Sequence, residues 1–200
     1  LRHMPWVGRV DPEALGSLID RLEEGHRANY ALAAQHRARL AELVKEADNA
    51  GQLAALQREV LLHDVDRLLV IKRHEITASH VYTYHYEGFR PGGGLYVMSA
   101  HDPERPPLEL VASPTGQILD CDLSYDGKVA LFSWRRRQDE GYHLWQVNVD
   151  GTGLKQLTDG AWHDYNACWL PDGGIAFLST RAPQFAYCWH APVGVVHRMD

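Results

Sequence analysis

The chain has 200 residues, of which 45% are hydrophobic and 23% charged, so it is long and apolar enough to bury the core of one domain, or of one domain and an appendage. Its formal net charge is −6 and Arg135–Arg137 is its one basic cluster, which argues against a nucleic-acid partner. No apolar run approaches the ~18 residues of a membrane span, so none is expected. Residues 1–10 lack the charged start, apolar centre and cleavage site of a signal peptide.

The pattern of residues 11–63 is helical. Asp11 and Pro12 supply an N-cap and a first-turn proline, and apolar residues then recur at helical spacing. Asn49–Gly51 is typical of a helix end, and a second amphipathic run follows it. The sequence therefore predicts a helical segment over 1–63, a hairpin with helices at about 12–48 and 52–63. A coiled coil that binds a partner is the alternative, although the heptads are irregular.

After residue 63 the sequence changes to short strands and turns, and one stretch recurs. DLSYDGKVALFSWR at 122–135 aligns with CWLPDGGIAFLSTR at 168–181 at a constant offset of 46 residues. Their Asp-Gly turns coincide, as do their serines and final arginines. A further strand follows each copy, and three earlier strand-like segments lie at 67–73, 94–99 and 108–113. This stretch is therefore a repeat unit and not an isolated hairpin.

A repeat in the mid-forties with four strands is typical of β-propeller blades. One blade cannot bury both of its faces, so blades stack around an axis. The sequence thus predicts a mainly β fold over 64–200, a partial propeller of about two and a half four-stranded antiparallel blades preceded by the α-helical hairpin. The blades are expected at about 65–115, 116–160 and 161–200, the last one truncated. A closed ring needs at least about four blades, so the chain is expected to be a fragment of a longer protein.

Two resemblances follow from these motifs. YHLWQVNVDGTGLKQLT and WLPDGGIAFLSTR, within about 116–200, resemble the WD-type repeats of TolB-like β-propellers. DRLLVIKRHE, FRPGGGLYVMS and STRAPQFAYCWHAPVGVVHRMD are, together with the helical segment, similar to the middle-domain propeller of proteins related to the hydrazine synthase alpha subunit. The first resemblance implies a multidomain bacterial protein in the periplasm or outside the cell. The second implies a haem- or metal-dependent oxidoreductase, whose haem is attached through CxxCH motifs.

Blade topology predicts where a binding site lies. In an antiparallel blade the connections between the second and third strands, and those between blades, share one face. The long segments 74–93, 136–142, 159–167 and 182–193 are all of this kind, whereas the turns around the Asp-Gly pairs, on the other face, are short. Long loops gathered on a rigid scaffold are where binding sites tend to lie.

These loops hold most of the histidines and aromatic residues that follow residue 63. The candidate ligand-binding residues are Tyr82, Tyr86, Arg90, Trp162, Asp164, Tyr187 and Trp189. Imidazole and thiol groups also bind transition metals or haem iron, and the candidate metal ligands are His80, His85, His163, Cys188 and His190. The alternative is that these side chains pack within the loops and bind nothing.

No catalytic motif is expected in this stretch. It contains no G-x-S-x-G, HExxH or CxxCH, and Ser133 and Ser179 occupy equivalent strand positions, as structural residues of a repeat do. Cys121, Cys168 and Cys188 are too widely spaced to indicate a disulfide or a redox compartment.

Two functions remain open. In the first, the propeller is a binding or docking module that presents its long loops to another domain of the same chain, to another protein or to a small molecule. In the second, it is the middle domain of an oxidoreductase that uses haem or a transition metal when complete.

Overall fold

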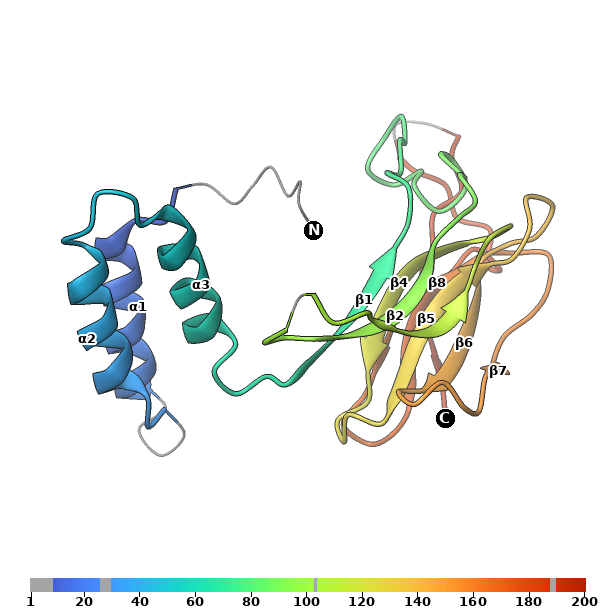
Figure 1. The fold of residues 1–200 in the computed structure, drawn as a ribbon. Coiled ribbons are helices and arrows are strands. Elements are labelled where there is room, and N and C mark those ends of the chain that lie inside the picture. Colours follow the sequence, from blue (N-terminus) through green and yellow to red (C-terminus); the bar gives the residue numbers. More distant parts are fainter. Residues whose placement is uncertain (1–8, 26–29, 103, 188–189) are drawn as a thin grey trace. The chain divides into compact units, whose positions relative to one another are not determined.

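The computed structural model describes residues 9–25, 30–102, 104–187 and 190–200. Within these ranges the chain forms three α-helices followed by ten β-strands (Figure 1). It divides into two compact units. The helical unit contains the residues up to Leu68 with Ser99–Pro106, and the β unit contains Leu69–Met98 with Pro107–Asp200. No helix in the described ranges is long and apolar enough to cross a membrane.

The helical unit has three helices, which are α1 (Pro12–Gly25), α2 (Ala33–Leu43) and α3 (Ala50–Leu61). The N-cap predicted at Asp11 is confirmed, because its carboxylate accepts a hydrogen bond from the Glu13 amide at 3.0 Å. The predicted single helix over 12–48 is wrong, and so is the hairpin. The first helix spans Pro12–Gly25, and Tyr30 is buried outside any helix before the second begins at Ala33.

The core of the helical unit is drawn from one face of each helix. Tyr30 lies within it and its hydroxyl is 2.7 Å from Nδ1 of His36, so that both buried polar groups are satisfied. The apolar residues buried from the helices are Leu15, Ile19, Ala33, Leu40, Leu43, Leu53, Leu56 and Val60. Three short amphipathic helices therefore share a core that a hairpin alone would leave half exposed.

Three antiparallel sheets follow. The first has the order β1-β2-β3, with β1 at Arg67–Lys72, β2 at Gly94–Ser99 and β3 at Leu108–Ala112. The second has the order β4-β5-β6-β7, with strands at Gln117–Leu123, Val129–Arg135, His143–Asn148 and Lys155–Gln156. The third has the order β8-β9-β10, with strands at Asp164–Trp169, Ile175–Ser179 and Val195–Met199.

The repeat found in the sequence is also a repeat in backbone geometry. The pairing of β4 with β5 is interrupted between Ile118 and Cys121, and that of β8 with β9 is interrupted between Tyr165 and Cys168. Both hairpins turn through a glycine with positive φ, 71° at Gly127 and 88° at Gly173, which only glycine adopts at little cost. Matching bulges and turns establish that the two sheets are copies of one unit.

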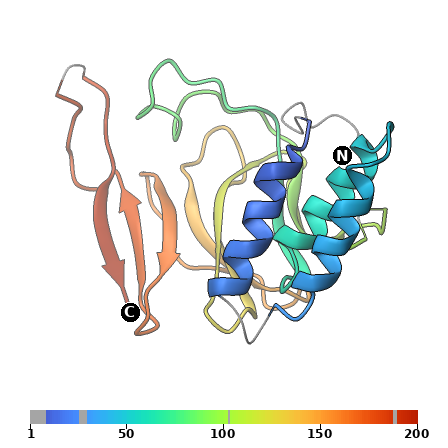
Figure 2. The same cartoon turned by 90° about the vertical axis from the view of Figure 1, so that its left-hand side faces the viewer.

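The second sheet lies between the other two, and both of its faces are buried. On β5, Ala130 and Phe132 belong to a core shared with the first sheet, whereas Leu131 belongs to a core shared with the third. This division follows from the two-residue period of a strand. Figure 2 shows the third sheet beside the second. Face-to-face sheets of consecutive strands make the β unit a partial propeller preceded by helices, as predicted.

Candidate functional site

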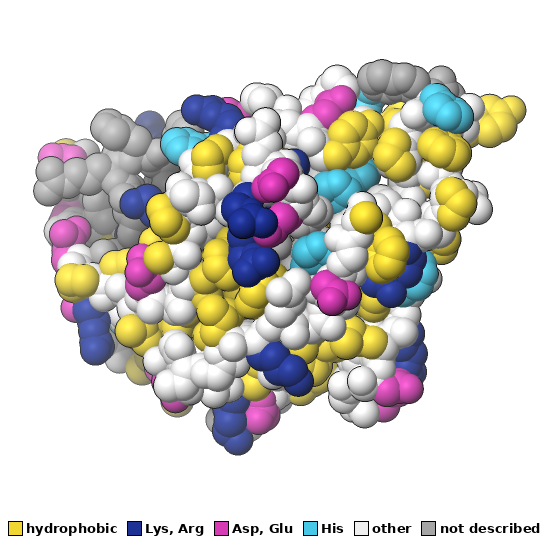
Figure 3. Space-filling model, turned by 90° about the vertical axis from the view of Figure 1, so that its right-hand side faces the viewer, with side chains coloured by type: hydrophobic (Ala, Val, Ile, Leu, Met, Phe, Trp, Pro, Cys, Tyr) yellow, Lys and Arg dark blue, Asp and Glu magenta, His cyan; other side chains and the backbone are white. Residues whose placement is uncertain are grey.

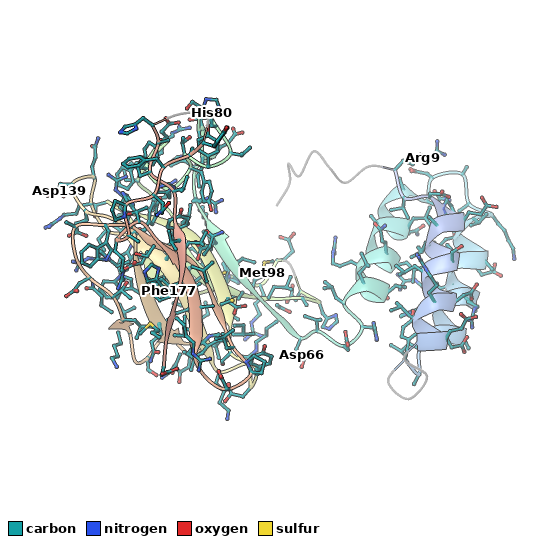
Figure 4. The ribbon with its side chains drawn as sticks, turned by 180° about the vertical axis from the view of Figure 1, so that it is seen from behind. Arg9, Asp66, His80, Met98, Asp139 and Phe177 are labelled. Carbon is teal, nitrogen blue, oxygen red and sulfur yellow. The ribbon has the colours of Figure 1, made fainter. Side chains whose placement is uncertain are left out.

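The long connections of the β unit lie at one end of its sheets. They are residues 73–93, 136–142, 157–163 and 180–194, and we call this end the loop face. Figure 4 labels His80 and Asp139 at this end and Met98, the fifth residue of β2, away from it. Backbone hydrogen bonds join neighbouring connections, from the Thr180 amide to the His163 carbonyl at 3.0 Å and from the Asp164 amide to the Tyr142 carbonyl at 2.7 Å. The predicted gathering of these loops is therefore present in the structure.

The connection 73–93 is packed onto the inner strands of the second and third sheets. His85 is fully buried and its ring stacks on Tyr165 of β8, with ring centroids 4.7 Å apart. Tyr84 meets the same ring edge-on at 5.8 Å and donates a hydrogen bond from its hydroxyl to Oδ1 of Asn166. Burial raises the pKa of Tyr165 to about 12, so its hydroxyl stays neutral. The base of the loop face is consequently well packed.

Two histidines from different connections meet at this base. The rings of His85 and His163 are 5.4 Å apart, and the Tyr142 amide donates to Nδ1 of His163 at 3.2 Å. The pKa of both histidines is lowered to about 4, mainly by burial, and the neighbouring His85 contributes to the shift of His163. Both imidazoles are therefore neutral near pH 7.

A buried ion pair fixes the neighbouring connections. Asp164 has no exposed surface, and both of its oxygens accept hydrogen bonds from Nη2 of Arg181, at 2.8 and 3.0 Å. Nδ1 of His143 lies 3.7 Å from the same carboxylate. Burial opposes ionisation of Asp164, but the polar groups of His143, Ser179, Arg181 and Thr158 around its carboxylate outweigh burial and hold its pKa at about 2. The guanidinium of Arg181 also covers the ring of Trp162 at 5.1 Å.

A shallow pocket of about 360 Å³ lies between connections 136–142 and 157–163. Its lining includes the buried His143 and the half-buried His163 together with Arg135, Asp139 and Glu140. Glu140 is paired with Arg137 at 2.8 Å, and Arg135 lies over the ring of Phe89 at 4.5 Å. Both carboxylates that line the pocket, those of Asp139 and Glu140, are paired with Arg137.

Exposed hydrophobic side chains occur at the tips of the loop face. Val81 is 89% exposed in connection 73–93, while Phe185 and Tyr187 are 49% and 108% exposed in connection 180–194. His190 stacks on Phe185 at 4.2 Å, and His80 stacks on Tyr82 at 5.4 Å. Figure 3 shows histidine and hydrophobic side chains together on the upper part of one face. The tips are therefore rich in apolar and aromatic surface that the β unit leaves uncovered.

The described candidate ligand-binding residues differ in how far they are exposed to solvent. Tyr187 and Arg90 are exposed, and Tyr82 and Tyr86 are half-buried. Trp162 is half-buried under Arg181, and Asp164 is an internal anchor that cannot touch a partner. Trp189 lies outside the described residues. The sequence did not single out His143 or Arg181 as site residues. Arg135 and Arg181 occupy equivalent positions in the two repeat copies, and this equivalence was the signal that pointed to Arg181.

The candidate metal ligands are only partly brought together. His85 and His163 are neighbours, whereas His80 and His190 stack on aromatic rings, and Cys188 lies outside the described residues. Among the residues that the structure describes, no three His, Cys, Asp or Glu side chains form a group that holds a metal ion. Two imidazoles without a third donor fall short of the three or four protein ligands of a zinc site. The metal site stays a prediction, and the described residues do not fit a preformed one.

Comparison with known proteins gives two short matches. No family model matches the chain. It is 34% identical over 70 residues to dipeptidyl-peptidase 5 of Porphyromonas gingivalis, covering 32% of this chain and 10% of that protein. It is 28% identical over 74 residues to hydrazine synthase subunit alpha of Kuenenia stuttgartiensis, covering 37% and 9%. The chain therefore matches only about a tenth of the length of these curated relatives.

Two similar solved structures are TolB proteins. A putative TolB from Agrobacterium tumefaciens has a TM-score of 0.42 and 19% identity, covering 54% of this chain and 34% of that one. TolB from Acinetobacter baumannii has a TM-score of 0.31 and 13% identity, covering 76% and 46%. The partial propeller is established by the strand order and the repeated bulge of this chain itself.

Proposed function

We propose that the β unit is a docking module, and that its loop face binds a neighbouring domain of the same polypeptide. The observation that carries this proposal is the exposure of Val81, Phe185 and Tyr187 at the loop tips. Apolar side chains that gather at one end of a scaffold are typical of interaction sites. The same proposal places the module in the periplasm or outside the cell, in line with the resemblance of its repeats.

The structure of the base supports this function. His85, Tyr165 and the Asp164–Arg181 pair fix the connections from below, so the tips lose little conformational freedom when they bind. Ordering an interface side chain or loop costs about 0.5–1.5 kcal/mol per side chain, and a fixed base avoids part of that cost. The paired charges of the shallow pocket favour a broad protein contact over a small ion.

Site-specific photo-crosslinking in the polypeptide that the gene encodes tests the proposal. A photoreactive phenylalanine analogue replaces Val81 or Tyr187, and the crosslinked peptides are mapped by mass spectrometry. The matched control position is Tyr125, which is 75% exposed in the turn between β4 and β5, away from the loop face. We expect crosslinks from 81 and 187 to one other domain and none from 125. No crosslink from either loop position, or equal crosslinking from 125, would contradict docking through this face.

A second candidate function is that of an oxidoreductase domain, which the match to hydrazine synthase subunit alpha and the His85–His163 pair favour. Neutral imidazole is the form that binds transition metals and haem iron. Metal analysis and absorption spectroscopy of the purified protein test it, with His163→Ala as the variant and His101→Ala, an exposed histidine of the helical unit, as the control. Metal that is lost in the first variant and kept in the second supports this function. Equal metal content in both variants, or none in the wild type, excludes it.

A further inference from the structure

The first sheet lacks one strand position that the second sheet fills. Residues 113–116 connect β3 to β4, just as residues 157–163 connect β7 to β8. By this correspondence β3 matches β7, β2 matches β6 and β1 matches β5. The second sheet has β4 beside β5, whereas β1 is an edge strand of the sheet β1-β2-β3. Within the described ranges, the inner position of the first sheet is therefore vacant.

The chain directly before β1 cannot fill this position. Helix α3 ends at Leu61 and β1 begins at Arg67, so only residues 62–66 lie between them. The inner strand β4 alone has 7 residues, and the turn 124–128 separates it from β5. A strand that pairs with β1 must come from a more distant part of the sequence.

The inner strands β4 and β8 of the second and third sheets indicate which side chains a strand paired with β1 would carry. Oδ2 of Asp120 on β4 accepts a hydrogen bond from the Asn166 amide at 2.9 Å, and Oδ2 of Asp122 accepts one from the Trp169 amide at 2.8 Å. The first of these bonds reaches the bulge of β8, where the amides leave the regular ladder. Carboxylates of one inner strand thus satisfy amides of the next.

The bulge of β4 lacks the same support. It interrupts the pairing between Ile118 and Cys121 in the same way, yet no carboxylate in the described part of the chain bonds its amides. The charge beside the vacant position is also positive. Lys72 and Arg73 end the β1 segment and are exposed, and Nη1 of Arg73 donates to the Leu119 carbonyl at 3.2 Å. An acidic strand is complementary to this site in both hydrogen bonding and charge.

We propose that the edge of β1 binds an antiparallel inner strand from a further repeat of the same polypeptide, in which apolar residues combine with two carboxylates as in Gln117–Leu123. Main-chain hydrogen bonds to β1 give such a strand its affinity, as in other cases of strand addition to an exposed sheet edge. Its carboxylates bond the amides of the β4 bulge, and its apolar side chains extend the core that contains Leu69 and Ile71.

The test uses a peptide from the chain's own inner strand as the probe. Residues 116–124, with Cys121→Ser to prevent oxidation, are labelled with a fluorophore and titrated with the 200-residue chain. A second peptide also carries Asp120→Ala and Asp122→Ala. We expect the first peptide to bind and the second to bind at least about tenfold more weakly, since the second has lost the carboxylates that make two charge-assisted hydrogen bonds. The changes are in the peptide, so they cannot unfold the protein.

Hydrogen exchange and two protein variants locate the binding. The amides of Leu69–Lys72 should become protected when the first peptide is added. Arg73→Gln should weaken binding several-fold, whereas the matched control Lys155→Gln, an exposed cation on β7, should not. Absence of binding, equal affinity of the two peptides or unprotected β1 amides would overturn the proposal. A dimer that protects these amides without peptide would overturn the same-chain source and assign the edge to a second copy.

Discussion

Asp164→Asn is the substitution whose effect the structure predicts in most detail. The Asp164 carboxylate is fully buried and accepts two hydrogen bonds from Arg181. An asparagine of nearly the same shape retains the packing and removes the charge. The variant should therefore report on the ionised state of this group and not on a cavity.

The magnitude follows from the shift in pKa. Asp164 has a folded-state pKa of about 2 against an ordinary value of 3.8, and each unit corresponds to about 1.36 kcal/mol. Because the folded-state pKa is the lower one, the stabilisation is fully present above about pH 4 and is lost as the pH falls toward 2. It amounts to about 2 kcal/mol at pH 7, and about half of it remains at pH 3.

Urea unfolding followed by tryptophan fluorescence measures this effect. Of the six tryptophans only Trp6 lies outside the β unit, so the signal reports on the sheets. The free energy of unfolding should be about 2 kcal/mol lower in the variant at pH 7, and the difference should shrink by about half at pH 3. Asp159→Asn, which changes an exposed carboxyl in the connection that precedes β8, should change stability by less than about 0.5 kcal/mol. A difference between variant and wild type that is equal at both pH values would refute the reasoning.

Two further predictions concern the base of the loop face and its turns. His85→Phe should weaken the pH dependence of stability between pH 6.5 and 4. Buried His85, with a pKa of about 4, stays neutral in this range while the same residue of the unfolded chain takes up a proton, which costs the folded state about 3 kcal/mol by pH 4. An unchanged slope of the urea midpoint against pH would contradict this. Gly93→Ala should destabilise by more than about 3 kcal/mol in the same assay, since its φ is +91° and a Cβ would clash with the Lys72 carbonyl oxygen. Gly127→Ala, with a φ of +71° and open space around it, should cost only about 1–2 kcal/mol, and equal losses at the two glycines would rule out the steric explanation.

The strands of the second and third sheets could be predicted because their signals are local. Asp-Gly turns and alternating apolar residues mark each hairpin, and the constant offset of 46 residues shows that the hairpins are related. The break after Gly25 could not be predicted in the same way. Apolar residues continue at helical spacing beyond it, and only the burial of Tyr30 in a core shared by three helices explains why a separate helix begins at Ala33. Tertiary packing overrides local periodicity at that point.

The candidate site shows the same limit. Blade topology placed the long loops on one face, and the structure has them there. The sequence did not distinguish His85, which is fully buried, from Tyr187, which is fully exposed, because both are aromatic residues in long loops. Burial of a loop residue depends on which strand lies beneath it. Tyr165 of β8 lies beneath His85, about 80 positions further along the chain.

The two levels of the loop face make the proposed docking separable from the stability of the fold. The base is held by ring stacking on Tyr165 and by the buried Asp164–Arg181 pair, while Val81 and Tyr187 contribute almost nothing to the core. A substitution at the tips should therefore change binding and leave the free energy of unfolding within about 0.5 kcal/mol. A substitution at the base should change both binding and the free energy of unfolding. Loosened connections give the tips more conformational freedom, and that freedom must be lost again on binding. The proposed docking requires that division, since tips that were part of the core would have no apolar surface to offer.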